Sequence, residues 1–224
     1  MDRSTIPDEL LHYEYARERL FCRLGNACGT DGLRAGTLLI RRMDLVLTCY
    51  CLLGGSGPSF AVIPVREPLP DIWGIGEEQL FRDARANTEA EGRLLFERLD
   101  ALLRPQDIPG MPGSPLYILT NRDKLLGAVY MVLPDILKMT ADRLQSDLYV
   151  IPSSVHECLI LPDDGSYRTE ELNRMVRDIN RSLLREDEVL SEHVYRVDAA
   201  AETITACTDA EGEMMTASFA ALEF

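Results

Sequence analysis

The chain contains few of the residues on which catalysis and metal binding most often depend. Among its 224 residues are three histidines, one tryptophan and six cysteines, and no two cysteines are spaced as C-x-x-C. The patterns H-E-x-x-H, G-x-G-x-x-G, G-x-x-x-x-G-K-[S/T] and G-x-S-x-G, which mark zinc peptidases, dinucleotide sites, P-loops and serine hydrolases, do not occur. We therefore expect no metal ion and no cofactor.

Basic side chains are also scarce. The 23 lysines and arginines stand against 37 aspartates and glutamates, which gives a formal net charge of −14. Proteins that bind phosphate backbones need clustered lysine and arginine to displace counterions, so direct binding of nucleic acid is not expected. A dense acidic surface can instead imitate nucleic acid toward a basic protein. An acidic inhibitor of a nucleic-acid-binding protein, such as a nuclease, therefore remains among the hypotheses.

Long apolar runs are absent from the sequence. The longest, residues 45–53, has less than half of the roughly 20 residues that a membrane-spanning helix needs. Residues 1–9 lack the basic start and apolar run of a secretory signal. We expect a cytoplasmic protein that does not enter a membrane and whose cysteines remain thiols. Cys49 and Cys51 alternate within the apolar run, and both are expected to pack inward.

Hydrophobic periodicity in the first half of the chain predicts helices and a buried hairpin. The apolar run before the glycine-rich turn at 54–58 is too continuous to be amphipathic, and it could equally be part helix. The expected elements are a helix over 8–24, strands over 37–53 and 60–65, a helix beginning at residue 77, and a helix over 94–103.

The second half begins after a stretch rich in proline and glycine at 105–115, which can form neither a helix nor a central strand. Short strands then alternate with helices in the order β-β-α-β-β-α-β-β. Paired short strands cannot be parallel neighbours without a long crossover, so we expect an antiparallel sheet with amphipathic helices packed on it, an α+β fold. The expected elements are strands over 116–120, 127–133, 148–152, 156–161, 194–197 and 203–206, with helices beginning at Pro134 and Thr169.

This pattern predicts an N-terminal helical and hairpin region over 1–104, a linker over 105–115 and an α+β domain over 116–224. A single continuous globular unit is the alternative.

The most polar segment beside a histidine is 151–158. In an extended chain Ser154 and His156 project from the same face, where a hydroxyl and an imidazole can form a nucleophile and its base, with Glu157 beside them. Side chains two apart on one strand are roughly 7 Å apart at their roots, however, and catalytic pairs usually come from different segments. The alternative is a corner between two strands, in which Ser153 and Ser154 bond to turn backbone.

A second polar segment, 188–195, contains His193. Together with His156 and a carboxylate such as Glu157 or Glu192, this histidine would complete a two-histidine, one-carboxylate metal site. The spacing of these residues gives no support for that approach. The alternative is that Ser191 and Glu192 bond to local backbone.

Several segments resemble a family of proteins. Residues 149–157, 159–163, 175–180 and 189–195, together with 71–75 through 87–88, are similar to the signature of domain-of-unknown-function family 5688, which is typical of anaerobic gut Firmicutes. The resemblance covers most of the chain and implies a bacterial source and a shared fold. The family has no established activity. Its motif positions mark as candidate functional residues Ser153, Ser154, His156, Glu157, Asn180, Ser191, His193 and Tyr195.

Three hypotheses follow from these observations. The leading one is a non-enzymatic interaction or regulatory protein with a protein partner that the sequence does not identify, because the strong features are core and turn features. The second is a hydrolase or metal-dependent enzyme built around Ser154, His156, Glu157 and His193, with Ser153, Asn180, Ser191 and Tyr195 as candidate binding residues. The third is the acidic mimic of nucleic acid. The sequence does not define the oligomeric state.

Overall fold

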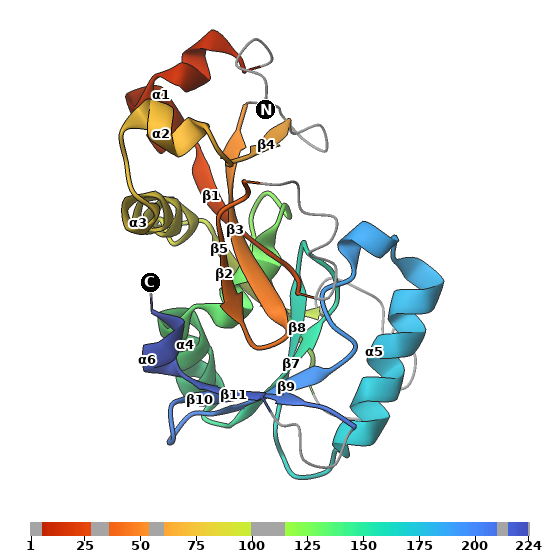
Figure 1. The fold of residues 1–224 in the computed structure, drawn as a ribbon. Coiled ribbons are helices and arrows are strands. Elements are labelled where there is room, and N and C mark those ends of the chain that lie inside the picture. Colours follow the sequence, from red (N-terminus) through yellow and green to blue (C-terminus); the bar gives the residue numbers. More distant parts are fainter. Residues whose placement is uncertain (1–5, 28–35, 54–60, 100–114, 210–214, 224) are drawn as a thin grey trace.

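The fold consists of two antiparallel sheets with helices around them (Figure 1). The computed structural model describes residues 6–27, 36–53, 61–99, 115–209 and 215–223.

The first sheet has four strands in the order β1-β3-β2, with β4 also paired to β3. Its strands are β1 (Leu20–Asn26), β2 (Leu39–Arg42), β3 (Leu45–Leu52) and β4 (Val62–Pro64). β3 is the central strand, since it pairs with the other three, and its first five residues are all buried, whereas β1 alternates between buried and half-buried residues. The predicted hairpin is confirmed by the antiparallel pairing of β3 with β4, and Cys49 and Cys51 are fully buried, as expected.

The second sheet has seven strands in the order β11-β10-β9-β7-β8-β6-β5, and every pair is antiparallel. Its strands are β5 (Leu94–Arg98), β6 (Tyr117–Asn121), β7 (Leu148–Pro152), β8 (Cys158–Pro162), β9 (Val194–Asp198), β10 (Thr203–Cys207) and β11 (Met215–Ser218). The predicted α+β class is confirmed.

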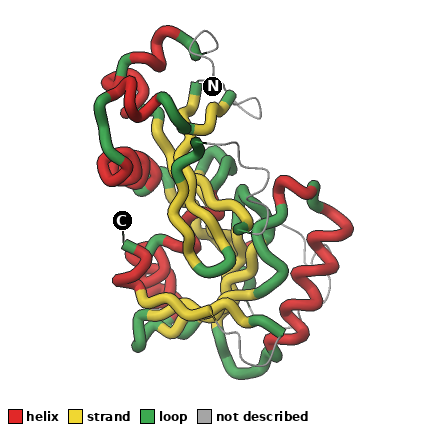
Figure 2. The backbone as a smooth tube through the Cα atoms, viewed as in Figure 1, coloured by secondary structure: helices red, strands yellow, loops and turns green. Residues whose placement is uncertain are grey.

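Helices cover the sheets from several sides. In Figure 2 the strands run through the middle of the molecule, and α5 stands on the opposite side of the seven-stranded sheet from α4 and α6. The α-helices are α1 (Tyr13–Arg17), α2 (Leu69–Trp73), α3 (Glu77–Thr88), α4 (Pro134–Leu144), α5 (Thr169–Leu183) and α6 (Phe219–Leu222). Short 3-10 helices are η2 (Asp8–Leu11), η6 (Gly127–Val132) and η7 (Glu186–Glu188).

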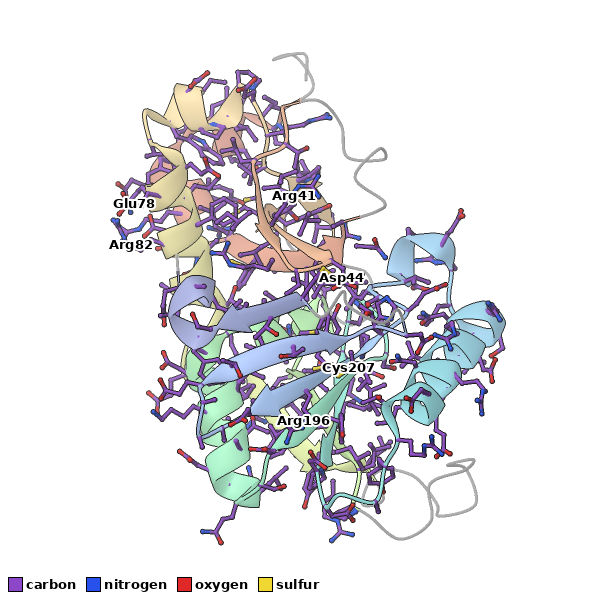
Figure 3. The ribbon with its side chains drawn as sticks, turned by 60° about the horizontal axis from the view of Figure 1, so that its bottom comes forward. Arg41, Asp44, Glu78, Arg82, Arg196 and Cys207 are labelled. Carbon is purple, nitrogen blue, oxygen red and sulfur yellow. The ribbon has the colours of Figure 1, made fainter. Side chains whose placement is uncertain are left out.

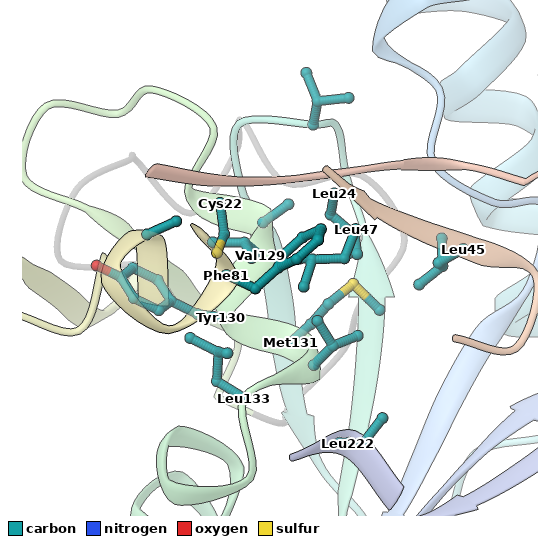
Figure 4. Packing of buried hydrophobic residues seen from close by; sticks show 14 of the residues in the cluster. Cys22, Leu24, Leu45, Leu47, Phe81, Val129, Tyr130, Met131, Leu133 and Leu222 are labelled. Carbon is teal, nitrogen blue, oxygen red and sulfur yellow. The ribbon is translucent and has the colours of Figure 1, made fainter. Parts of the chain in front are cut away.

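Side chains of β7 alternate between two hydrophobic clusters, as expected for a strand covered on both faces. Leu148 and Val150 belong to the main core, whereas Tyr149 and Ile151 belong to a smaller cluster together with Leu172 and other residues of α5. The main core is continuous from the first sheet to the second. Figure 4 shows this core where β1, β3, α3 and η6 meet, around Leu24, Leu47, Phe81 and Met131.

The helix predicted over 8–24 is wrong in its second half. The chain forms η2 and α1 and then enters β1 at Leu20. Leu20 and Leu24 are four residues apart, and positions i and i+4 share a face in a helix and in a strand. Their spacing therefore fits both structures, and the burial of Cys22 between them shows the strand.

Two further predictions are wrong for related reasons. The strand predicted over 127–133 is the 3-10 helix η6, and all of its residues are buried, so no alternation distinguishes the two structures. The helix predicted over 94–103 is wrong in its described part, which forms the edge strand β5, where Phe96 is buried and the next two residues are exposed. Leucines in this segment recur at helical spacing, but the pairing of β5 with β6 decides the structure.

Other predictions lie outside the described residues. They are the glycine-rich turn at 54–58 and the linker at 105–115, except for its last residue. Within the described ranges no helix has both the length and the apolar character needed to cross a membrane.

Gly127 occupies a position that only glycine fits. A Cβ at Gly127 would overlap Thr120 Oγ1 and would lie 2.7 Å from the amide nitrogen of Asn121 and 2.9 Å from the carbonyl oxygen of His156. We therefore expect Gly127→Ala to lower the free energy of unfolding by about 2 kcal/mol, measured by denaturant titration. Gly25→Ala is the control, because its Cβ would meet the nearest atom at 3.6 Å. Equal stability of the two variants would contradict the packing described here.

Candidate functional site

The segment between β7 and β8 forms a corner in which serine bonds to backbone. Ser154 is 8% exposed, and its hydroxyl oxygen accepts the backbone N–H of His156 at 3.0 Å. The backbone N–H of Ser154 donates to the carbonyl oxygen of Glu157 and closes the turn. No hydrogen bond joins the Ser154 hydroxyl to the His156 imidazole in this described segment. Ser153 is half-buried at the start of the corner, and burial raises the pKa of Glu157 at its end.

His156 holds the loop that precedes η6. Its Nδ1 atom accepts the backbone N–H of Leu126 at 3.2 Å, and its carbonyl oxygen accepts the backbone N–H of Gly127 and the hydroxyl of Thr120. Leu126 has a left-handed φ of 57°, a strained conformation that these bonds fix. Because Nδ1 accepts a hydrogen bond, the neutral imidazole bears its proton on Nε2.

The Nε2 atom of His156 faces a charged cluster. It lies 4.0 Å from Glu188 Oε1, and Arg185 donates to the same oxygen at 3.0 Å. Arg23 donates to the hydroxyl of Tyr50 at 2.5 Å from the first sheet. Burial lowers the pKa of His156, and although Glu188 opposes this shift, Arg23 and Arg185 add to it. His156 is therefore a neutral acceptor at neutral pH.

A small cavity lies on the other side of this loop. It has a volume of about 30 Å³, which is the space of one or two water molecules. Leu126 and Val129 line it opposite Phe21 and Tyr50 of the first sheet. The cavity is too small for a substrate.

A second junction is built around Asp44, in the turn between β2 and β3. Met43 has a left-handed φ of 56° at this turn. The Asp44 carboxylate accepts the Ser191 hydroxyl at 2.6 Å and the Tyr195 hydroxyl at 2.5 Å, one on each oxygen. Figure 3 places Asp44 where the β2–β3 hairpin meets the seven-stranded sheet. One side chain thus joins the two sheets.

Tyr195 depends on this carboxylate because its side chain is fully buried. Burial and the nearby Asp44 raise the pKa of Tyr195 well above its ordinary value, so the phenol keeps the proton that it donates. Hydrogen bonds to a charged acceptor are short and roughly twice as strong as neutral ones. The sequence does not mark Asp44 as a candidate, because the apolar pattern over 37–53 predicts one continuous element. The feature of the sequence that could have indicated this residue is the presence of an acid within an otherwise apolar segment.

Ser191 also connects α5 to this junction. Its hydroxyl oxygen accepts the backbone N–H of His193 at 3.1 Å, and its carbonyl oxygen accepts Asn180 Nδ2 at 2.9 Å. Asn180 is 8% exposed, and its Oδ1 atom is buried without a hydrogen-bond partner among the residues that the structure describes. His193 Nδ1 is likewise buried and has no partner in the described ranges. The structure therefore brings together four predicted residues, Asn180, Ser191, His193 and Tyr195.

The two histidines have different surroundings. His156 faces Glu188 and Arg23, whereas His193 lies near Asp209. Across the described ranges no three histidine, cysteine or acidic side chains gather as a metal site would require. The five described cysteines are buried and free. The geometry therefore gives no support to a site that unites His156 with His193.

A broad hollow opens to solvent beside Asn180, and we name it the 180–192 hollow. It has a volume of about 620 Å³, within the range of small-molecule and peptide sites. It lies at the C-terminal end of α5 and beside η7. Its lining includes Asn180, Arg181, Leu184, Glu186, Val189 and Glu192.

The fold and these two junctions define an α+β protein whose motif residues form hydrogen bonds to backbone and join its two sheets. The chain belongs to the family of unknown function DUF5688, whose model matches residues 2–198. The resemblance of the motif segments to that family is confirmed. No curated protein and no solved structure matches the chain.

The hydrogen bond between Asp44 and Tyr195 predicts that substitutions at these two residues have non-additive effects on the free energy of unfolding. We expect Tyr195→Phe to lower the free energy of unfolding by about 2 kcal/mol, because a hydrogen bond from a buried phenol to a charged group is lost. In a protein that already has Asp44→Asn, we expect the same change to cost less than about 1 kcal/mol. A double-mutant cycle by denaturant titration measures the difference. Additive effects of the two changes would contradict this geometry.

The environment of His156 predicts a loss of stability in acid. Its pKa in the folded state lies below that of the unfolded chain, about 6.5. The contribution of neutral His156 to the stability of the folded state is complete above about pH 6.5. It decreases as the pH falls below this value, because His156 takes up a proton in the unfolded chain first. His156→Asn retains an acceptor for the Leu126 N–H and cannot titrate. We expect the wild type to lose more stability than His156→Asn between about pH 7 and pH 5. If the free energy of unfolding of the two proteins changed in parallel with pH, the titration of His156 would have no part in the loss of stability in acid.

Proposed function

We propose that the protein is a non-enzymatic, cytoplasmic interaction or regulatory protein that binds a protein partner through the 180–192 hollow. The observation that carries the proposal is the hollow itself. It is open to solvent, has the volume of a binding site, and combines apolar with charged side chains. Interfaces between proteins combine an apolar centre with a polar rim in the same way.

The positions of the motif residues support this proposal. Asn180 donates to the carbonyl oxygen of Ser191, and the Ser191 hydroxyl donates to Asp44, so these bonds fix Asn180 in the lining of the hollow. Ser154 and His156 bond to backbone at the other junction. Side chains that shape a surface in this way give a partner a rigid site, which lowers the entropic cost of binding.

One observation favours an enzyme as the second candidate. His156 Nε2 lies 4.0 Å from Glu188 Oε1, and a histidine beside a carboxylate is a common general base. The cavity behind its loop is too small for a substrate, so catalysis would need the open side of the imidazole. This candidate requires a turnover that His156→Ala abolishes while the protein remains folded.

The third hypothesis, an acidic mimic of nucleic acid, requires carboxylates that gather on one face. On α3 acids and bases alternate, because Glu78 pairs with Arg82 and Arg85 pairs with Glu89. Arg177 and Arg181 are interspersed with the acids of α5. This alternation gives the mimic no support.

Co-purification tests the proposed function. The tagged protein is recovered from a lysate of its source organism, with nuclease added, at low and at high salt, and bound proteins are identified by mass spectrometry. We expect a partner that is retained at high salt, because apolar contacts in the hollow are not screened by ions. The control is the same protein with Leu184→Asp, which places a charge in the hollow.

Two outcomes would overturn the proposal. A partner that is lost entirely at high salt, with no effect of Leu184→Asp, would favour the acidic mimic. A monomer without a partner, together with a hydrolytic activity that His156→Ala removes, would favour the enzyme.

A further inference from the structure

The first sheet has an outer face that points away from the main core. Successive side chains of a strand lie on opposite faces, so residues between core positions belong to the outer face. On β3 the core positions are the odd-numbered ones from Leu45 to Cys51, and Thr48 therefore lies on the outer face. Arg23 of β1 and Leu39 of β2 are both paired with Thr48 and share its face.

Two further arginines lie on this outer face. Arg41 is two residues beyond Leu39 on β2 (Figure 3). Arg66 is paired with Thr37, two residues before Leu39, and it follows the fully buried core residue Val65. No acid occupies an outer-face position of the four strands as the structure describes them, although the chain has a net charge of −14. The outer face is therefore a basic patch in an acidic protein.

These three arginines lack carboxylate partners. None of them forms an ion pair with any residue that the structure describes. Arg23 donates to the hydroxyl of Tyr50 and, at 3.4 Å, to the carbonyl oxygen of Asp187. Arg41 is exposed, and Arg66 is only 8% exposed, yet neither side chain has a hydrogen-bond partner in the described ranges. Two positive charges on this face are therefore free to bind an anion.

The Arg66 side chain is enclosed along its length but open at its end. Its Nε atom is buried and unpaired. Its Nη1 and Nη2 atoms also lack partners among the described residues, but they are not enclosed, so the accessible part of Arg66 includes them. A cation removed from water without a counter-charge costs free energy, which a bound anion would offset. An anion that approaches from solvent would meet the two terminal nitrogens.

The register of the strands lets the arginines converge above Leu39 and Thr48. Leu39 is a diagonal cross-strand neighbour of Arg66, and such neighbours are about 7–8 Å apart and within reach of long side chains. Arg41 is two positions away from Leu39 on the same strand, about 7 Å. Arg23 lies on the other side of Thr48, which is about 5 Å from each of its paired residues.

We propose that the outer face of the first sheet binds one phosphate dianion, either free or carried by a small organic ester, through Arg41 and Arg66, with Arg23 at the edge of the site. The planar guanidinium group matches the geometry of phosphate oxygens and can donate two parallel hydrogen bonds to them. The two charges of the dianion balance those of Arg41 and Arg66.

The acidic remainder of the protein restricts the ligand to a small anion. A nucleic acid would extend beyond three arginines and be repelled by the surrounding carboxylates, whereas a single phosphate group fits within the patch. None of the three arginines lines the 180–192 hollow. The inference therefore goes beyond the proposed function and does not depend on it.

Calorimetric titration of the full-length protein tests the inference. The titration is done in a chloride buffer at about pH 7.5, where a phosphate monoester carries two charges. The probes are inorganic phosphate and glycerol 3-phosphate, and uncharged glycerol is the control. We expect a dissociation constant below about 1 mM for at least one phosphate and no binding of glycerol. No binding of either phosphate up to about 10 mM would overturn the inference.

The two phosphates distinguish the sources of the dianion. Tighter binding of glycerol 3-phosphate would assign the site to an organic ester, because groups beyond the phosphate would then contribute contacts. Equal or tighter binding of inorganic phosphate would assign it to the free ion.

Arginine variants locate the site. We expect Arg41→Gln to weaken phosphate binding about fivefold and Arg66→Gln about tenfold, because each removes a charge-assisted hydrogen bond. Arg174→Gln is the matched control, since Arg174 is an exposed arginine of α5 without an ion pair among the described residues. Equal binding by the three variants would contradict the inference, because the anion would then bind elsewhere.

Thermal unfolding separates a binding role of Arg66 from a structural one. Without phosphate, we expect Arg66→Gln to unfold at the same temperature as the wild type or higher, because it removes an unpaired charge. Phosphate should raise the unfolding temperature of the wild type more than that of the variant. Lower stability of Arg66→Gln in both buffers, together with unchanged phosphate binding by Arg41→Gln, would overturn the inference. Arg41 is exposed, so its variant tests binding even where Arg66→Gln does not fold.

Discussion

The structure depends on one half-buried carboxylate at the junction of its two sheets. Asp44 accepts a hydroxyl from Ser191 on one oxygen and a hydroxyl from Tyr195 on the other. The acceptor lies in the turn between β2 and β3, and both donors lie in or just before β9, so a single side chain connects the two sheets. Ser191 extends the connection through its carbonyl oxygen to Asn180 of α5. Removing the carboxylate would leave a buried phenol without its acceptor, and this is why the junction is sensitive to a single change.

The second junction also joins separate segments of the chain through one residue. His156 binds the loop before η6 through its Nδ1 atom and its carbonyl oxygen, while its Nε2 atom faces Glu188 of η7. η7 is therefore held by one junction and α5 by the other, and the 180–192 hollow lies between them. Three residues of the motif segments, Asn180, Val189 and Glu192, line this hollow. Their importance would then lie in holding the surface through which we propose that a partner binds.

Much of the fold could be predicted from local patterns. The amphipathic stripe of α5, the alternation of β7 and the turn before β4 are each specified by their own sequence. The errors occurred where two structures place the same residues on one face, as in β1, or where every residue is buried, as in η6. The site was partly predictable as well, because the motif segments contain Ser191, Tyr195 and Asn180. Their common partner, Asp44, is about 150 positions away, and sequence spacing cannot show a contact that only the packing of two sheets creates.

Hydrogen exchange tests most directly the claim that Asp44 couples the two sheets and the hollow. Backbone exchange would be measured, by mass spectrometry of peptides, in the wild type and in Asp44→Asn. The account predicts that three segments lose protection together, namely the β2–β3 turn, residues 189–195 and the last turn of α5, while β10 and β11 keep theirs. Loss of protection confined to the β2–β3 turn would contradict the account, because it would show that the carboxylate stabilises only its own turn.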